Sequence, residues 1–332
     1  MNNIIKFFDI NKREVSVPIE EQRQRWLKEF LKAFLVVFSV YACMYFVRNN
    51  LKAAQPLLKN QLGFTTSELG YIGFGFSITY AMGKTILGYF VDGKNAKRII
   101  STLLIMSATM VFIIGIILLS GNKAVGTILV FWGLSGFFQA PGGPSSYSTI
   151  SRWTPTNKRG RFLGFWNMSH NIGGALAGMI ALFGANTFFH GNVAGMFIVP
   201  AIVGICVGFV LLFVGKDEPQ ELGWNSAEEI FNEPRVQSDA EIEEMSKFEI
   251  FKKYVLTNPW IWVLCIANVF VYIVRIGIDN WAPLYVTEQL HFAMNDAVNT
   301  IFYFEIGALL GSLTWGYVSD LLKGRRAIVA VF

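Results

Sequence analysis

Long apolar runs, separated by short charged segments, constrain this chain more than any other feature. A helix needs about 20 mostly apolar residues to cross the roughly 30 Å hydrocarbon core of a bilayer. Eight stretches are long enough, at about 30–55, 69–91, 98–119, 125–148, 161–189, 193–215, 259–287 and 298–321, and a ninth is expected to begin at Arg326. The runs predict an all-α polytopic membrane protein with eight complete transmembrane helices.

The composition agrees with lipid-facing helices and excludes an ordinary soluble domain. Of the 332 residues, 53% are hydrophobic and only 15% are charged, against about 25% charged residues in soluble domains. The net charge of +5 is spread over short segments instead of one basic face, so nucleic acid is not an expected partner. Cys43, Cys206 and Cys265 lie inside apolar runs without metal-ligand spacing, so neither a metal site nor a cofactor is expected.

The Lys and Arg residues predict the orientation of the chain. They gather before the first apolar run and after the second, fourth, sixth and eighth, whereas the alternate segments hold only Lys52, Lys59 and Lys123. Because basic residues concentrate on the cytoplasmic side, we expect a cytoplasmic N-terminus. The long, acid-rich segment 216–257 is then a solvated cytoplasmic linker between a six-helix domain, 1–215, and part of a second domain, 258–332.

Two unrelated features repeat at one spacing. Gly88 and Asp92 begin a short turn that ends with Lys97 and Arg98. The same pattern recurs near the end of the chain, at Gly316, Asp320, Arg325 and Arg326. The two aspartates are 228 residues apart. Arg48 and Arg275, each inside an apolar run, are 227 residues apart. The shared offset indicates a duplicated six-helix unit, a transporter design whose site lies at the midplane between the halves.

The two intramembrane arginines are the first candidate site residues. Arg48 lies 16 residues after Lys32, and Arg275 lies 16 residues after Pro259, which places each about 24 Å along its helix. An Arg at a helix centre costs about 2.5–3.5 kcal/mol on insertion scales, so it usually faces a cavity or a partner. The alternative, that each side chain reaches out to the membrane interface, is weakened by their matched positions.

Four more charged or titratable residues lie inside the runs. Lys84 and His170 are expected about 12–14 Å from the cytoplasmic edge, which leaves a gap of about 10 Å to the arginines. Asp279 follows Arg275 by one helical turn and is expected to pair with it, whereas Glu305 is either a partner or a proton site. His170 has the alternative role of a simple helix–helix hydrogen-bond donor.

The excess of cations suits a phosphate dianion, which the planar guanidinium of Arg grips with two hydrogen bonds. Further donors lie one or two turns from these charges: Tyr41, Tyr45, Tyr80, Tyr272 and Asn167. No hydrolase site is evident, since the serines after the PGGP stretch at 141–144 have no base at helical spacing.

At several stretches the chain closely resembles the organophosphate:phosphate antiporters of the major facilitator superfamily, most of all their hexose phosphate members. The stretches are FSITYAMGKT at 76–85, SGFFQ at 135–139, YSTISRWTP at 147–155, RFLGFWNMSHN at 161–171, FGAN at 183–186 and VRIGIDNW at 274–281. Members have twelve helices, so the resemblance implies a chain truncated after its eighth. It also implies a monomer in the lipid bilayer of the bacterial inner membrane.

The resemblance assigns roles to individual residues. It implies that Arg48 and Arg275 bind the phosphoryl group, with Lys84 and His170 beside it. Relatives often have Lys directly after the first arginine, where this chain has Asn49. The two G-x-x-x-D turns resemble the loop signature of the superfamily, which implies that they gate the cytoplasmic side; the alternative is that they only stabilise the turns.

The function implied is the obligatory exchange of a sugar phosphate, such as glucose 6-phosphate or another hexose phosphate, for inorganic phosphate by alternating access. Among transporters, glycerol 3-phosphate or phosphoglycerate is the alternative substrate. A transporter-like sensor that binds sugar phosphate without moving it is a second alternative, and an enzyme acting on phosphate esters is a third. Binding without flux would identify the sensor, and product release on mixing would identify the enzyme.

Overall fold

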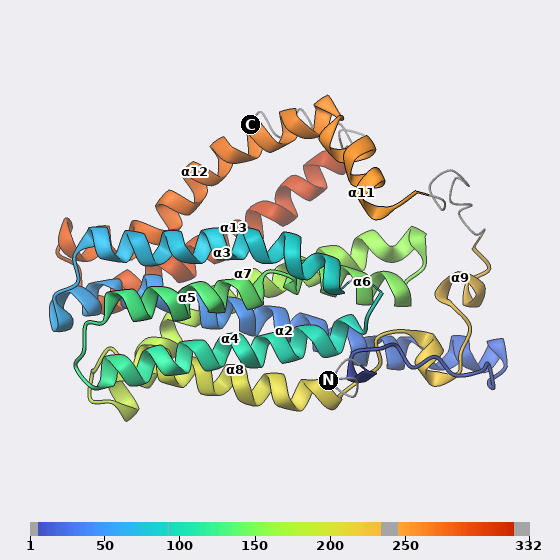
Figure 1. Cartoon of the computed structure of the whole chain (residues 1–332), viewed down its shortest axis with the longest axis horizontal. Helices are drawn as coiled ribbons and strands as arrows, with labels where there is room; N and C mark the ends of the chain where they lie inside the picture. The colour runs from blue at the N-terminus through green and yellow to red at the C-terminus, as the bar shows by residue number, and fades with distance from the viewer. Residues whose placement is uncertain (1–5, 92, 234–244, 322–332) are drawn as a thin grey trace.

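A computed structural model describes residues 6–91, 93–233 and 245–321, which fold into a bundle of long helices (Figure 1). The long helices are α2 (Ile19–Leu62), α3 (Thr66–Val91), α4 (Ala96–Leu119), α5 (Val125–Gln139), α6 (Gly142–Trp153), α7 (Thr156–Phe188), α8 (Gly195–Phe213), α12 (Pro259–Glu288) and α13 (Met294–Leu321). The short elements are η1 (Pro219–Leu222), α9 (Ala227–Ile230), α11 (Lys247–Ile250) and the π-helix η2 (Phe251–Leu256). Seven of the eight expected runs each form one helix near the predicted place, and the run at 125–148 forms two, α5 and α6. The helix expected from Arg326 lies outside the described residues.

Seven of the described helical segments are long and apolar enough to cross a membrane, with α5 and α6 counted as one segment, Val125–Trp153. The helix α3 is not among them, although its 26 residues span about 39 Å. Gly70, Gly73, Ser77, Tyr80 and Lys84 of α3 line a cavity described below. These residues lower the mean hydropathy of α3, because one face of the helix lines the cavity and does not contact lipid or an apolar core.

The break between α5 and α6 follows from Pro141, which has no backbone N–H to continue the helical ladder. Gly142 then lets α6 approach α2 closely, because a Cβ there would lie 2.6 Å from Met44 Sδ. The run expected at 125–148 is therefore one membrane crossing made of two helices.

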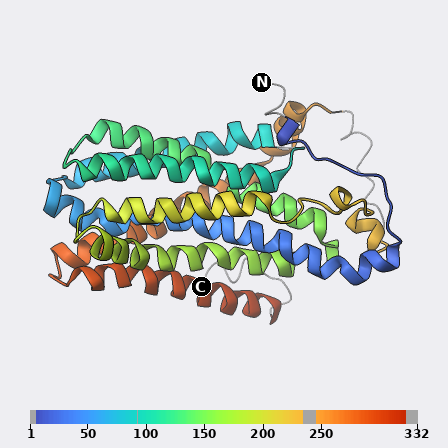
Figure 2. The same ribbon diagram turned by 90° about the horizontal axis from the view of Figure 1, so that it is seen from below.

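The helices α2 to α8 pack in close pairs, α4 with α8, α2 with α7 and α3 with α5. Small residues set the spacing between α2 and α7: a Cβ on Gly173 would collide with the carbonyl oxygen of Ala42. Val40, Met44 and Val47 of α2 are buried at the centre of the apolar core. Figure 2 shows α13 beside α7, and the contacts between the two helices agree.

The helix α2 has 44 residues, about 66 Å, so its first third extends beyond the bundle (Figure 1). There Trp26 and Phe30 form a small separate core with Trp153, Trp224 and Ile230. Trp26 Nε1 donates to the carbonyl of Trp153 at 2.8 Å. The first part of segment 216–257 is thus packed against the protein, which corrects the expectation of a fully solvated linker: its apolar side chains find a partner surface on α2.

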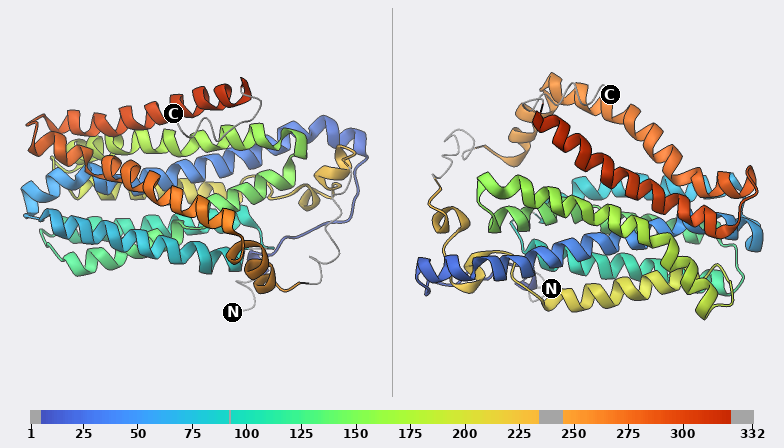
Figure 3. Two further views of the ribbon diagram at one scale, coloured as in Figure 1. Left: turned by 90° about the horizontal axis from the view of Figure 1, so that it is seen from above. Right: turned by 180° about the vertical axis from the view of Figure 1, so that it is seen from behind.

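The helices α12 and α13 form a second group against this bundle. Figure 3 shows that α12 meets the bundle near its C-terminal end and diverges from it toward Pro259. Pro283 and Leu284 of α12 are buried, whereas the side chains from Trp260 to Val274 are largely exposed. The space between this group and helices α2, α3 and α7 holds the candidate site.

Candidate functional site: a cation-lined cavity between two helix groups

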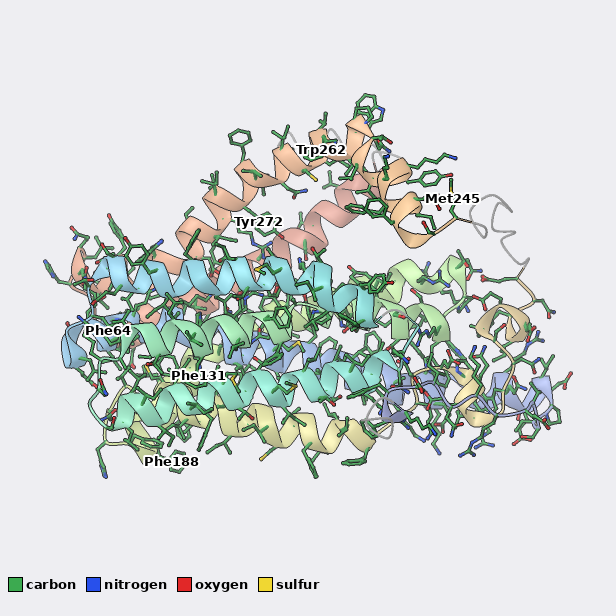
Figure 4. All side chains as sticks on the ribbon, in the orientation of Figure 1. Phe64, Phe131, Phe188, Met245, Trp262 and Tyr272 are labelled. Carbon is green, nitrogen blue, oxygen red and sulfur yellow. The ribbon has the colours of Figure 1, made fainter. Side chains whose placement is uncertain are left out.

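A cavity of about 700 Å³ lies between α2, α3 and α7 on one side and α12 and α13 on the other. Its volume falls in the range of small-molecule sites, about 300–1,000 Å³. All nine residues that the sequence analysis singled out as candidate binding residues line it: Tyr41, Tyr45, Arg48, Tyr80, Lys84, Asn167, His170, Tyr272 and Arg275. Tyr272 lies on the side of α12 that faces the rest of the bundle (Figure 4).

Arg48 is held by aromatic rings. Its guanidinium carbon lies 4.6 Å from the ring centre of Tyr80, 4.9 Å from that of Phe76 and 5.2 Å from that of Tyr45. Such cation–π contacts attract a positive charge without neutralising it. Among the described residues, neither Arg48 nor Arg275 forms an ion pair with a carboxylate.

The gap expected between the arginines and the other cations is closed by side chains. Lys84 Nζ lies 5.0 Å from the centre of the Tyr80 ring that Arg48 also contacts. Side chains on a helix lean toward its N-terminus, so Arg48 leans back toward the level of Lys84. The rings of Tyr45 and His170 are 5.2 Å apart, and both arginines interact electrostatically with His170.

Asp279 does not pair with Arg275, contrary to the expectation from its helical spacing. Its Oδ1 lies 2.5 Å from Nζ of Lys52 on α2, and the Lys52 ammonium is also 4.0 Å from Glu305 on α13. Lys52 was expected in an external segment from the sequence pattern, but it is buried inside α2. The helix continues ten residues past it, so the apolar run ends well before the helix does.

The Lys52–Asp279 pair shows how the two helix groups are related. These residues are 227 apart in the sequence, the same offset that separates Arg48 from Arg275. The helices α2 and α12 therefore meet at corresponding positions of the repeat, and the two arginines lie one turn, about 6 Å, before that meeting point. The offset itself was the signal that could have identified the ion pair.

A second ion pair reinforces this end of the cavity. Lys59 of α2 contacts Glu288 at the end of α12. With Lys52 and Asp279 it ties α2 to α12 at the end where Leu284 is buried. Toward Pro259, the helices diverge (Figure 1).

The loop residues have other contacts. Lys97 is buried and donates from Nζ to the carbonyls of Leu212 and Val214 at the end of α8, at 3.0 and 2.8 Å. Arg98 donates to the carbonyl of Phe7 at 2.8 Å. Asp320 lies in the last described turn of α13, and Asp92, Arg325 and Arg326 lie outside the described residues, so the gating role remains a prediction.

Asp217 is a buried carboxylate that the sequence pattern did not predict. It accepts from the backbone N–H groups of Ala96 and Lys97, both at 3.1 Å, and from Thr149 Oγ1 at 2.5 Å, and it pairs with Arg152. A carboxylate at the N-terminus of α4 is favoured by the helix dipole. Its position in an acid-rich segment gave no sign of this burial.

Most of the chain is related to known membrane transporters. The model of the Major Facilitator Superfamily matches residues 37–332. A hexose-6-phosphate:phosphate antiporter of Salmonella typhimurium is 47% identical over 97% of this chain and 70% of its own length. A glycerol-3-phosphate transporter of Bacillus subtilis is 33% identical over 91% of this chain and 67% of its own.

A solved structure supports the fold. The bacterial homologue of the human lysosomal transporter Spinster, in an inward-facing and unoccupied conformation, matches with a TM-score of 0.64 at 18% identity, covering 88% of this chain and 63% of that one. The fold and the cavity define a polytopic membrane transporter. The chain belongs to the major facilitator superfamily and, within it, to the organophosphate:phosphate antiporters.

Proposed function

We propose that the protein exchanges a sugar phosphate for inorganic phosphate, with hexose phosphates such as glucose 6-phosphate as the organic substrate. The observation that carries the proposal is that two arginines line one cavity and that neither forms an ion pair with a described carboxylate. The nearby acids Asp279 and Glu305 are engaged with Lys52. The name of the relative from Salmonella typhimurium supports the substrate class.

The proposed mechanism uses one guanidinium from each half. Arg48 on α2 and Arg275 on α12 grip a phosphate dianion, each with its planar pair of N–H donors. Without the dianion, two positive charges approaching each other in a site of low dielectric repel, so the empty carrier does not reorient. A bound dianion offsets the repulsion, and only the loaded carrier alternates. Exchange is then obligatory, and the two substrates need share only a phosphoryl group.

The other cavity residues complete the phosphoryl site. Lys84, beside Tyr80, supplies a third positive charge, and His170 supplies a donor. Further hydrogen bonds come from the tyrosines and the amide of the set: Tyr41, Tyr45, Tyr80, Tyr272 and Asn167. The aromatic rings around Arg48 hold its guanidinium in place before the substrate arrives, which lowers the cost of binding.

We propose that the protein is a monomer in the bacterial inner membrane. The distribution of Lys and Arg supports a cytoplasmic N-terminus. On this orientation, the ion pairs of Lys52 and Lys59 lie at the periplasmic end of the cavity. The loop residues Lys97 and Arg98 lie at the cytoplasmic end, where we propose that the repeated turns gate access.

A competition assay tests the substrate class. Proteoliposomes that contain the complete protein and are loaded with phosphate should take up radiolabelled phosphate, and external glucose 6-phosphate should inhibit that uptake at lower concentration than glycerol 3-phosphate or phosphoglycerate does. Loaded phosphate should leave only when a substrate is present outside. The glycerol-3-phosphate transporter among the relatives makes glycerol 3-phosphate the second candidate. Stronger inhibition by that ester would replace hexose phosphate, and binding without uptake would indicate a sensor.

A further inference from the structure

We propose that Tyr147 forms an aromatic platform against which the sugar ring of a hexose phosphate packs, and that this contact favours a cyclic ester over an open-chain one. The proposal rests on the proposed function, because it assumes that Arg48 and Arg275 bind the phosphoryl group. Tyr147 belongs to α6 and lines the cavity. It is 44% exposed, which leaves part of its side chain open to a ligand.

A row of aromatic rings leads from the phosphoryl site to Tyr147. Tyr45 contacts Arg48, and the ring centres of Tyr45 and Tyr41 are 5.4 Å apart. Trp166 follows Tyr41 at 4.5 Å, and Tyr147 follows Trp166 at 4.8 Å. Tyr147 is the exposed member of this row, whereas Trp166 is buried. The buried ring therefore supports the exposed one and holds it in place before a ligand arrives.

Tyr147 lies on the opposite side of the arginines from the ion pair of Lys52. Gly143 of α6 is at the level of Tyr41, since a Cβ there would lie 3.7 Å from the Tyr41 hydroxyl. From Gly143, α6 continues toward Trp153, which packs in the small core at the start of α2. Tyr147 is one turn, about 6 Å, along this path. Along the axis of α2, the arginine site thus lies between Lys52 and Tyr147.

The cavity has room for a sugar on the Tyr147 side. At the other end, the ion pair between Lys52 and Asp279 ties α2 to α12. On the Tyr147 side, α12 diverges from the bundle toward Pro259 (Figure 3). A phosphoryl group at the arginines can therefore carry a larger group toward Tyr147. Inorganic phosphate has no such group and does not reach this ring.

The chemistry of a tyrosine ring matches that of a sugar ring. The face of an aromatic ring carries negative partial charge, and the C–H groups on one face of a hexose ring carry positive partial charge. The two faces attract each other, and their contact removes apolar surface from water. An open-chain ester presents no flat face of this kind. A purely structural tyrosine would have its ring buried in the core, as Trp166 has.

The test compares two substrates in phosphate-loaded proteoliposomes that contain the complete protein. Tyr147→Ala should raise the KM for glucose 6-phosphate about tenfold, which converts to about 1.4 kcal/mol. The KM for phosphate self-exchange should stay at the wild-type value. Tyr147→Phe keeps the ring and should retain the wild-type affinity for both substrates. Phe213→Ala is the matched control, since Phe213 is an exposed aromatic residue at the end of α8, outside the cavity, and it should change neither KM.

Sorbitol 6-phosphate, an open-chain relative of glucose 6-phosphate, tests the preference for a ring. The wild-type protein should bind it more weakly than glucose 6-phosphate. In Tyr147→Ala this preference should disappear, because the platform that distinguishes the two esters is missing. A preference that is the same in both proteins would overturn the proposal.

The remaining outcomes separate this proposal from the proposed function. Equal effects of Tyr147→Ala on glucose 6-phosphate and phosphate, or none on either, would overturn the platform, as would a loss in Tyr147→Phe as large as that in Tyr147→Ala. A wild-type protein that exchanges phosphate but ignores all hexose phosphates would overturn it together with the choice of substrate. Absence of any phosphate exchange would instead refute the proposed function itself.

Discussion

At the residue scale, Arg48 shows how a charge is kept in a membrane helix without being neutralised. Lipid would penalise it, and a carboxylate partner would stabilise it but remove its attraction for an anion. Three aromatic rings, with centres between 4.6 and 5.2 Å from the guanidinium carbon, stabilise the charge without neutralising it. The two acids of the cavity contact Lys52, and neither forms an ion pair with Arg48 or Arg275.

The Lys52–Asp279 pair makes a prediction for stability. Lys52→Met leaves the buried Glu305 and the half-buried Asp279 without a cation, and breaking a buried pair in this way costs about 3 kcal/mol. Asp279→Asn should also destabilise, and the double variant should lose clearly less than the two single losses added together. Thermal unfolding of the purified protein in detergent measures all three. Additive losses would show that the two side chains do not interact.

At the element scale, glycine determines how closely α2 and α7 approach. Gly173→Ala places a methyl group on the carbonyl of Ala42, so the helices must separate and stability should fall by about 1–3 kcal/mol. Gly164→Ala on the same helix meets no atom within 4 Å and should be neutral or raise stability by up to about 1 kcal/mol through helix propensity. Thermal unfolding of both variants is the measurement. Equal effects would mean that packing at Gly173 is not tight.

The packed segment after α8 gives a prediction for pH. Burial raises the pKa of Glu218 above its usual value, although Lys12 and Arg152 partly offset this. The ionised carboxylate of Glu218 therefore lowers the free energy of unfolding. This loss is absent below the unfolded pKa of about 4.3, where the carboxyl is protonated in both states, and it develops as pH rises through the folded pKa. Glu218→Gln should have the higher melting temperature at pH 7, and the difference should vanish near pH 4. A difference that is constant with pH would contradict this.

At the scale of the whole molecule, hydropathy predicted the helices well but their contacts poorly. Each apolar run became helical because a helix satisfies every backbone hydrogen bond of a segment that lies in a bilayer. Matched positions in the repeat also brought Arg48 and Arg275 to one cavity. The Lys52–Asp279 pair was missed because the apolar run ends before α2 does, which placed Lys52 in an external segment, although the offset of 227 residues indicated the pair. The packing of Trp224 was missed because it depends on a surface, the start of α2, that is distant in the sequence.

The central claim, that one arginine from each half grips the phosphoryl group, is tested most directly by phosphate self-exchange in proteoliposomes. We expect Arg48→Ala and Arg275→Ala each to reduce exchange by at least about 100-fold, since each variant loses a charge-assisted bidentate contact of about 3 kcal/mol. Ser120→Ala, at the exposed C-terminal end of α4 and outside the cavity, should exchange at the wild-type rate when it is reconstituted at the same protein density. Normal phosphate exchange by the correctly inserted Arg275→Ala variant would contradict the account.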